Sequence, residues 1–356
     1  MPLKIIVFAV LMISTLIINF DMPKKVIDQI QMVTVVGYDY IDEEMLQGTV
    51  ITPFYQQQNT VQNLIYTGQA SSIYENREKL NAQASEELYN GKIEVAFFND
   101  EFARHGLKKV IDYMLRDPSI GSRIFLAVAK GSSNELLTNV SSQKEAGIFL
   151  ADLIEHNIRN GNLPLTNLKQ FNHGVEGKTI DPFLPMLSLE DGQPSLTALA
   201  FFQDDKLVDT LPYEEAFRFK MLYENIGDGQ YNFENDEYRI SVHNIESKRD
   251  IKVQKLNGDP QVTFDIRFTG VVREYTGKNL TKDLKKVEKD LEENFKKNAN
   301  KLIKRFKELK IDPLGIEEQV KAQMRSYNNK KFQDQYRDLP VKIKIKFKIT
   351  ETGTRR

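Results

Sequence analysis

Three patterns of hydrophobic and polar residues follow one another along this 356-residue chain. The first is an apolar stretch at residues 5–20, which carries no charged side chain. The second is a mixture of alternating and helical apolar spacings that runs through the amino-terminal half. The third combines a long amphipathic helix with a final strand in which apolar residues alternate with lysines.

The apolar stretch at residues 5–20 predicts an uncleaved amino-terminal membrane anchor. As a helix it would span roughly 24 Å, which is short of a hydrocarbon core of roughly 30 Å. A cleaved export signal needs small residues at the cut, and residues 18–21 contain none. A lipoprotein signal needs a cysteine just past the stretch, and the chain has no cysteine. A signal cut at an unconventional site and a buried core helix remain the alternatives.

Predicted strands and predicted helices alternate along the amino-terminal half. A capping box at residues 72–75 predicts a helix that continues to about residue 89, and Asn99 with Asp100 starts another. Residues 179–189 have an extended pattern, and their two prolines argue against a central strand. Residues 31–40 have β-branched residues in near alternation, which predicts a strand, and further strands are predicted at 46–55, 61–67, 92–98 and 123–129.

The carboxy-terminal half begins after the turn signal at residues 191–194, where we place a domain boundary. Its clearest element is an amphipathic helix at 281–310, whose apolar residues recur at helical spacing and whose lysines fall mostly on the other face. Lysines alternate with apolar residues in the final strand at 341–350, which predicts one buried and one solvated face. Further strands are predicted at 195–203, 206–211, 238–245, 251–256 and 262–275.

These elements predict an α+β fold in which an N-terminal hydrophobic anchor precedes two, or three, mixed α/β domains. The sheets should be mainly antiparallel, with helices packed on them. The predicted divisions are a signal or membrane-anchor segment at 1–22, an N-terminal domain at 23–192 that could subdivide, and a C-terminal domain at 193–356.

Composition narrows the classes of function. The 49 Lys and Arg residues balance 50 Asp and Glu residues, so net charge gives no reason to predict a nucleic-acid partner. The absence of cysteine excludes disulfides, thiolate nucleophiles and cysteine-bound metals. An exported protein of this composition must therefore rest on its apolar cores.

The sequence also lacks the common catalytic and nucleotide-binding motifs, including the P-loop, H-E-x-x-H and G-x-S-x-G. Its four histidines, His105, His156, His173 and His243, fall on different predicted elements without the spacing of metal ligands. We therefore predict no catalytic residue, cofactor or metal, and no enzymatic activity. An exported hydrolase without a recognisable motif remains a minor alternative.

Several stretches, taken in order, resemble one known family. Residues 25–39 end in Gly37 and Asp39, and two further motifs follow, Arg116-Asp117-Pro118 and Lys130-Gly131. Residues 199–207, the lysine-rich helix and the closing lysine-rich strand complete the set. In this order and spacing they resemble the Ger(x)C family, the C subunits of bacterial spore germinant receptors.

The resemblance implies a non-enzymatic subunit on the outer face of the spore inner membrane, with integral-membrane A and B subunits as partners. Members of the family are usually lipoproteins, but Asp21 stands near the expected position of the lipid-bearing cysteine. Lipid attachment is therefore not carried over, and membrane association would rest on residues 5–20. The motif residues have no assigned role. The alternative function is an exported protein that binds a small ligand.

Overall fold

The computed structural model describes residues 29–55, 60–256, 259–325 and 327–352, together with Phe8. The predicted anchor at 5–20 lies outside the described residues except for Phe8, and so does Asp21. No helix in the described part of the chain has the length and apolar character needed to cross a membrane.

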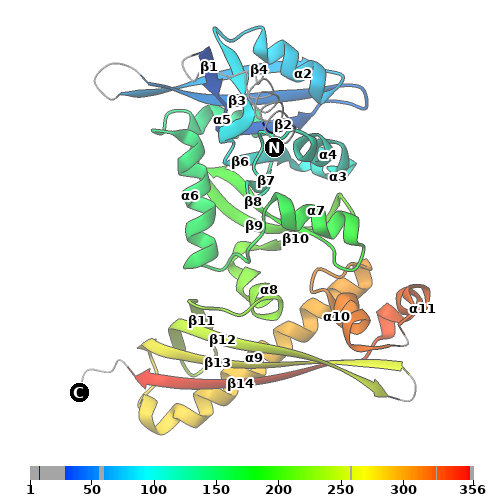
Figure 1. Ribbon diagram of the computed structural model, residues 1–356. Helices are drawn as coiled ribbons and strands as arrows, with labels where there is room; N and C mark the ends of the chain where they lie inside the picture. Colours follow the sequence, from blue (N-terminus) through cyan, green and yellow to red (C-terminus); the bar gives the residue numbers. More distant parts are fainter. Residues whose placement is uncertain (1–7, 9–28, 56–59, 257–258, 326, 353–356) are drawn as a thin grey trace.

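An eight-stranded mixed sheet organises the larger part of the molecule (Figure 1). Its strand order is β10-β9-β8-β7-β6-β2-β3-β4, and the run from β8 to β2 is parallel while the pairs on either side are antiparallel. The strands are β2 (Val35–Tyr40), β3 (Leu46–Tyr55), β4 (Val61–Ala70), β6 (Val95–Asn99), β7 (Phe125–Ala129), β8 (Phe183–Glu190), β9 (Gln193–Gln203) and β10 (Lys206–Pro212).

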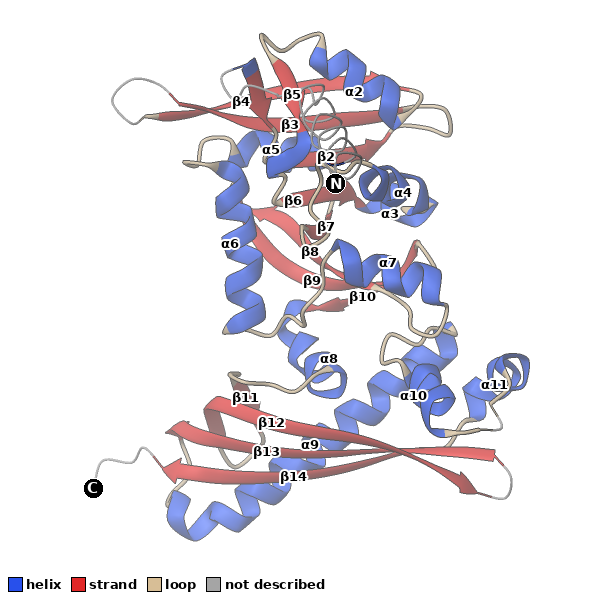
Figure 2. Ribbon diagram, viewed as in Figure 1, coloured by secondary structure: helices blue, strands red, loops and turns tan. Residues whose placement is uncertain are grey.

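Helices cover both faces of this sheet because its central strands are apolar on both sides. Val35 and Phe97 belong to one core, whereas their neighbours Val36 and Phe98 belong to the other. The first core is covered by α5 (Ser133–Val140), α6 (Ala146–Arg159) and α8 (Ala216–Tyr223). The second is covered by α2 (Ile73–Asn81), α3 (Asp100–His105), α4 (Lys108–Arg116) and α7 (Leu168–Gly177). Figure 2 shows this layered arrangement, and the predicted α+β class is confirmed.

Two predicted helices differ from the structure. The helix that begins after the capping box ends at Asn81, because the following residues turn back and form β5 (Glu87–Tyr89), which pairs in parallel with β1 (Ile30–Met32). The helix that begins at Asp100 breaks at Gly106, whose φ of 119° lies outside the helical region, so α3 and α4 are separate.

The prediction that prolines keep residues 179–189 out of the sheet interior is wrong, since β8 lies between β7 and β9. Pro182 precedes the strand. Pro185 comes before Met186, the first residue of β8 that pairs with β7. Its missing N–H therefore removes no hydrogen bond from that ladder.

A four-stranded sheet of order β11-β12-β13-β14 forms the other part of the molecule. The strands predicted at 238–245 and 251–256 are one strand, because the polar residues 246–250 between them also pair with residues 265–269, after a register shift that begins at His243. The elements are β11 (Tyr231–Glu234), β12 (Arg239–Leu256), β13 (Asp259–Tyr275), α9 (Leu280–Leu309), α10 (Ile316–Gln323), α11 (Asn329–Gln335) and β14 (Val341–Thr352).

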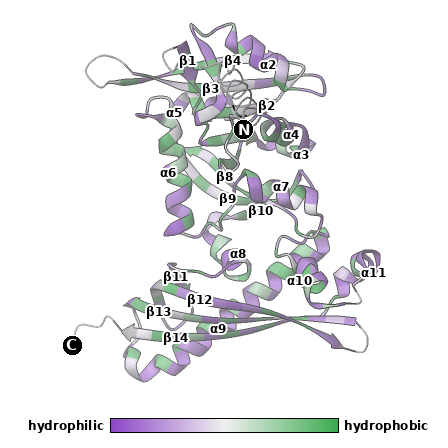
Figure 3. Ribbon diagram, viewed as in Figure 1, coloured by the Kyte–Doolittle hydropathy of each residue, from purple (hydrophilic) through white to green (hydrophobic). Residues whose placement is uncertain are grey.

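The helix α9 covers one face of this sheet. Its bounds differ by one residue from the predicted 281–310, and Asn279 rather than Thr281 caps it by accepting a hydrogen bond from the N–H of Lys282 (3.0 Å). Hydrophobic and hydrophilic residues alternate along α9 (Figure 3), and its buried hydrophobic residues contact the sheet. Lys342 and the other lysines of β14 are exposed on the opposite face.

The two sheets share a continuous core. Phe201 of β9 contacts Phe306 of α9 edge-to-face, with ring centroids 4.9 Å apart, and Phe219 of α8 packs against both. The turn at residues 191–192 joins β8 and β9, which are paired in one sheet. The sheet therefore continues across the position of the proposed domain boundary.

Candidate functional site

Four of the family-motif residues meet at the amino terminus of α5. Asp39, near the end of β2, is buried, and its carboxylate accepts hydrogen bonds from the backbone N–H of Ser133 (2.6 Å) and of Asn134 (2.9 Å). It also accepts one from the Ser133 hydroxyl (2.9 Å). The carboxylate thus satisfies helix N–H groups that have no partner within the helix, and its charge suits the positive end of the helix dipole.

Gly37 lies two residues earlier on the same face of β2. A Cβ atom there would lie 2.8 Å from both the Leu137 Cδ1 and the Ser133 Oγ atoms of α5. Glycine is therefore the residue that lets α5 approach the sheet closely enough for Asp39 to reach its first turn. The Gly-x-Asp pair acts as a docking site for one helix.

Lys130 and Gly131 form the turn that carries the chain from β7 into α5. The N–H of Lys130 donates to the Leu187 carbonyl (2.8 Å), and its side chain is exposed. Gly131 has a φ of 84°, and its N–H donates to the Asp100 carboxylate (3.0 Å). Glycine adopts this left-handed conformation without strain, so its place here is conformational.

The third motif lies elsewhere, at the end of α4. The Asp117 carboxylate accepts hydrogen bonds from Ser119 (N–H 3.0 Å, hydroxyl 2.6 Å) and Asn90 (3.0 Å), and Arg77 lies 3.7 Å away. Burial raises the pKa of Asp117, but these hydrogen bonds outweigh it and leave the pKa below its ordinary value. Arg116 and Pro118 are exposed.

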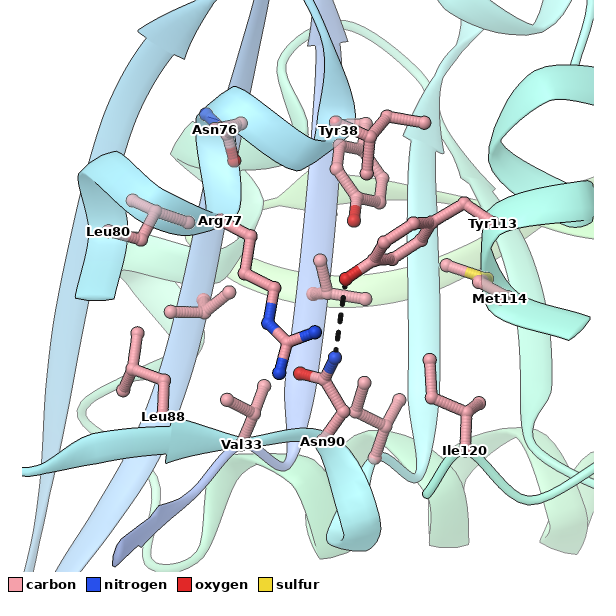
Figure 4. Close-up of a pocket in the computed structure, with 14 residues that line it drawn as sticks. Val33, Tyr38, Asn76, Arg77, Leu80, Leu88, Asn90, Tyr113, Met114 and Ile120 are labelled. Carbon is pink, nitrogen blue, oxygen red and sulfur yellow. Dashed lines mark hydrogen bonds between the residues drawn. The ribbon is translucent and has the colours of Figure 1, made fainter. Parts of the chain in front are cut away.

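A small cavity lies beside Asp117, under α2 and α4 (Figure 4). Figure 4 shows Arg77 extending toward Asn90 and Tyr113, across walls that are otherwise mostly apolar. Burial, followed by the neighbouring Tyr113, raises the pKa of Tyr38 well above its ordinary value. The cavity measures about 30 Å³, the scale of a single water molecule, whereas pockets for small ligands measure about 300–1,000 Å³.

A larger groove of about 480 Å³ lies where β1, the end of β3 and the start of α6 meet. Phe54 and Tyr55 are 46% and 64% exposed there, and because other apolar side chains line the same groove they belong to a patch rather than being isolated surface residues. We call it the β3 groove, and its apolar lining is Ile30, Met32, Pro53, Phe54, Tyr55 and Ile148.

Two carboxylates that no sequence pattern indicated lie close together between the two sheets: Asp181 is half-buried and Asp312 is buried. Asp312, after α9, is 6% exposed, and its backbone N–H donates to the Asp181 carboxylate (2.5 Å). Burial is the main reason that the pKa of Asp181 rises to about 6 and that of Asp312 to about 7. These residues are 131 positions apart, so no local pattern could have indicated the pair.

The histidines lie apart in the structure as well. His105 stacks on Tyr40 with ring centroids 3.8 Å apart, and His173 lies 3.8 Å from Glu318. Across the described ranges, His, Asp and Glu side chains form no group of three that could hold a metal ion.

Comparison with known proteins gives the same family for both halves. A family model described as the spore germination protein N-terminal domain matches residues 23–189, and one described as spore germination B3/GerAC-like, C-terminal, matches residues 197–353. Spore germination protein GerQC of Bacillus cereus is 29% identical over 336 residues, which cover 92% of this chain and 94% of the relative.

Two further known proteins also match most of this chain. The putative spore germination protein YfkR of Bacillus subtilis (strain 168) is 22% identical over 289 residues, covering 77% of this chain and 74% of the relative. The crystal structure of the GerBC protein aligns with a TM-score of 0.61 and 16% identity, covering 88% of this chain and 97% of that one. At this identity the structural likeness supports the fold alone.

Proposed function

This chain belongs to the Ger(x)C family of spore germination proteins, and from that premise we propose that it is a non-catalytic C subunit of a nutrient germinant receptor. It would act through protein–protein contacts with integral-membrane A and B subunits. The observation that carries the proposal is the match of family models to both halves of the chain.

The roles of the motif residues support a contact protein rather than a catalyst. Gly37, Asp39 and Gly131 place α5 on the sheet, and Asp117 fixes the end of α4. They do not converge on one cavity, and the cavity beside Asp117 is too small for a nutrient. Residues with such contacts maintain a shape, and a shape is what a receptor subunit presents to its partners.

We place the protein on the outer face of the spore inner membrane, held by residues 5–20 in place of a lipid. The mass of the membrane-extracted protein tests this anchor. An intact amino terminus without an added lipid is expected. A mass that lacks residues 1–20, or that includes a fatty acyl group, would contradict it.

The β3 groove suits contact with the membrane partners. At no more than about 3.6 Å per residue, the ten steps from residue 20 to Ile30 reach at most about 36 Å, so a chain anchored at 5–20 would hold this groove near the membrane. Its exposed Phe54 and Tyr55 are residue types enriched in the buried cores of protein interfaces. We therefore assign the groove to an apolar surface of the A or B subunit.

Loss of the gene tests the receptor role. In a strain without a second related copy, deletion should slow nutrient-triggered germination and leave germination by agents that bypass the receptor unchanged. Normal nutrient responses in the deletion strain would contradict the proposal.

Substitution in the groove tests the assigned surface. Phe54→Asp should reduce co-purification of the A and B subunits from spore membranes, because it places a charge in the apolar contact. Leu165→Asp is the matched control, since Leu165 is 41% exposed on a surface outside the groove. Equal recovery of the A and B subunits with both variants would reject the groove as the contact.

A further inference from the structure

A second large cavity lies where the two sheets meet, away from every motif residue. It measures about 380 Å³, and its lining residues come from the edge strand β10, the start of α8 and the middle of α9. Figure 1 shows where these three elements lie in the fold. Leu211, Pro212 and Leu302 provide its apolar wall. The volume falls within the usual range of small-molecule pockets, about 300–1,000 Å³.

Cationic side chains line this cavity from two helices. Asn298, Lys301 and Arg305 follow one another on α9 at spacings of three and four residues, so they share one stripe of the helix. Arg218 comes from α8. Three positive charges therefore face a cavity whose only lining carboxylate, among the described residues, is Glu215.

The Arg218 guanidinium interacts with the Tyr231 hydroxyl and with Glu215, but one of its donors is left without a partner in the part of the chain that the structure describes. Its Nη1 atom pairs with the Glu215 carboxylate at 2.8 Å, and its Nε atom is buried without a hydrogen-bond partner among the described residues. A buried N–H of a guanidinium group seldom goes unpaired in a folded protein. The planar guanidinium presents its donors in a fork that matches a carboxylate or phosphate group.

The other two cationic side chains, Arg305 and Lys301, also face the cavity. The Nη2 atom of Arg305 donates to the Asp209 carboxylate (2.6 Å) and to the Thr210 carbonyl (2.9 Å), which fixes the guanidinium at the edge of the cavity. Lys301 is exposed and has no ion-pair partner in the described part of the chain. Even with Glu215 and Asp209 counted, the three cations leave an excess of positive charge.

We propose that this cavity binds a small organic oxyanion, with Arg218, Lys301 and Arg305 holding its charged group and the apolar wall holding its carbon skeleton. The charged group can be a carboxylate or a phosphate, because both offer the oxygen pair that a guanidinium recognises. The site goes beyond the receptor role proposed above and does not depend on it.

Isothermal titration of the full-length protein in detergent tests the site, with succinate and inorganic phosphate as separate probes and sodium chloride holding the ionic strength constant. Saturable binding of either probe is expected. Binding of succinate alone assigns the site to carboxylates, and binding of phosphate alone assigns it to phosphates. No saturable binding of either probe would overturn the proposal.

Two lysine variants make the test specific. Lys301→Gln should weaken binding at least fivefold, and because Lys301 is exposed the variant should keep its fold. Lys304→Gln is the matched control on the same helix, since Lys304 lies outside the cavity lining, is 78% exposed and lies 3.8 Å from Glu308. Equal weakening in both variants would show general charge attraction and overturn the proposal, as would unchanged binding in Lys301→Gln.

Discussion

Gly37 and Asp39 occupy one face of β2, and each is explained by its contact with α5. The glycine provides the space and the carboxylate provides acceptors for Ser133 and Asn134. Asn134 in turn donates to the Thr49 and Thr67 hydroxyls of β3 and β4 (2.9 and 3.0 Å), so the helix is tied to three strands. A few side chains thus hold the junction on which this end of the sheet depends.

Replacement of Asp39 should be costly. Asp39→Ala leaves the N–H groups of Ser133 and Asn134 without their acceptor in a buried setting, and we expect a loss of about 3 kcal/mol in the free energy of unfolding. Urea denaturation measures it. Asp236→Ala, at an exposed carboxylate, should change stability by less than about 0.5 kcal/mol. Equal losses of stability in the two variants would contradict the role of Asp39 in docking α5.

A methyl group at Gly37 should also destabilise the protein. Gly37→Ala forces a Cβ atom against Leu137 and Ser133, which corresponds to overpacking that costs about 1–3 kcal/mol. Gly121→Ala serves as the control, because the nearest atom to a Cβ there is 3.9 Å away. Thermal unfolding of both variants gives the comparison, and a Gly37→Ala protein as stable as the control would contradict the close approach.

At the level of elements, the edge of the four-stranded sheet is protected by its own helix. β14 is an edge strand, and the N–H groups of Phe347 and Ile349 donate to the carboxylates of Glu292 and Glu288 on α9, each at 2.9 Å. An edge strand with free N–H groups is a template for pairing with another chain. The helix therefore both covers the apolar face of the sheet and blocks part of its open edge.

Removal of both glutamates should expose this edge. The double variant Glu288→Ala, Glu292→Ala is expected to self-associate more than the unmodified protein, in a concentration-dependent way, because the two N–H groups lose their acceptors. Analytical ultracentrifugation in detergent measures the change. Glu293→Ala, at a carboxylate that is 67% exposed, should leave the association state as it is. A double variant with unchanged sedimentation would argue against edge protection.

Local patterns predicted the elements that local residues determine. The alternation in β3 and β14 and the apolar stripe of α9 gave bounds within a few residues. The docking of α5 by Asp39 could not be predicted, because its partner lies 94 residues away. The interior place of β8 was mispredicted because the effect of Pro185 depends on where pairing with β7 begins.

At the level of the whole molecule, a cluster of carboxylates lies between the two sheets. Asp181 precedes β8 and Asp312 follows α9, and Glu317, which is 2% exposed, donates its N–H to the Asp312 carboxylate (2.7 Å). Asp181 and Asp312 line a cavity between the sheets. Asp204, Lys178 and Lys310 line the same cavity. Ionisation here would place like charges close together in a buried position, which is unfavourable.

Stability should therefore fall as pH rises through this range. The pKa of Asp312 is raised from 3.8 to about 7 and that of Asp181 to about 6, so between about pH 4 and 7 the folded protein binds more protons than the unfolded chain. Asp312→Asn keeps the buried position neutral and should raise the melting temperature at pH 8 more than at pH 5. Asp236→Asn is the control for a general charge effect, and an equal shift at both pH values would contradict the raised pKa.

The turn between β8 and β9 has a consequence for how the chain can be divided. One family model ends at residue 189 and the other begins at residue 197, on either side of this turn, yet the two strands pair from Phe183↔Phe201 to Glu190↔Gln193. If the chain were cut at Gly192, one fragment would carry β8 and the other would carry β9, its partner. Expressed separately, each fragment would have an unpaired strand edge. The fragments should behave as a split protein and restore one folded molecule when co-expressed, which affinity capture of one fragment through the other would reveal.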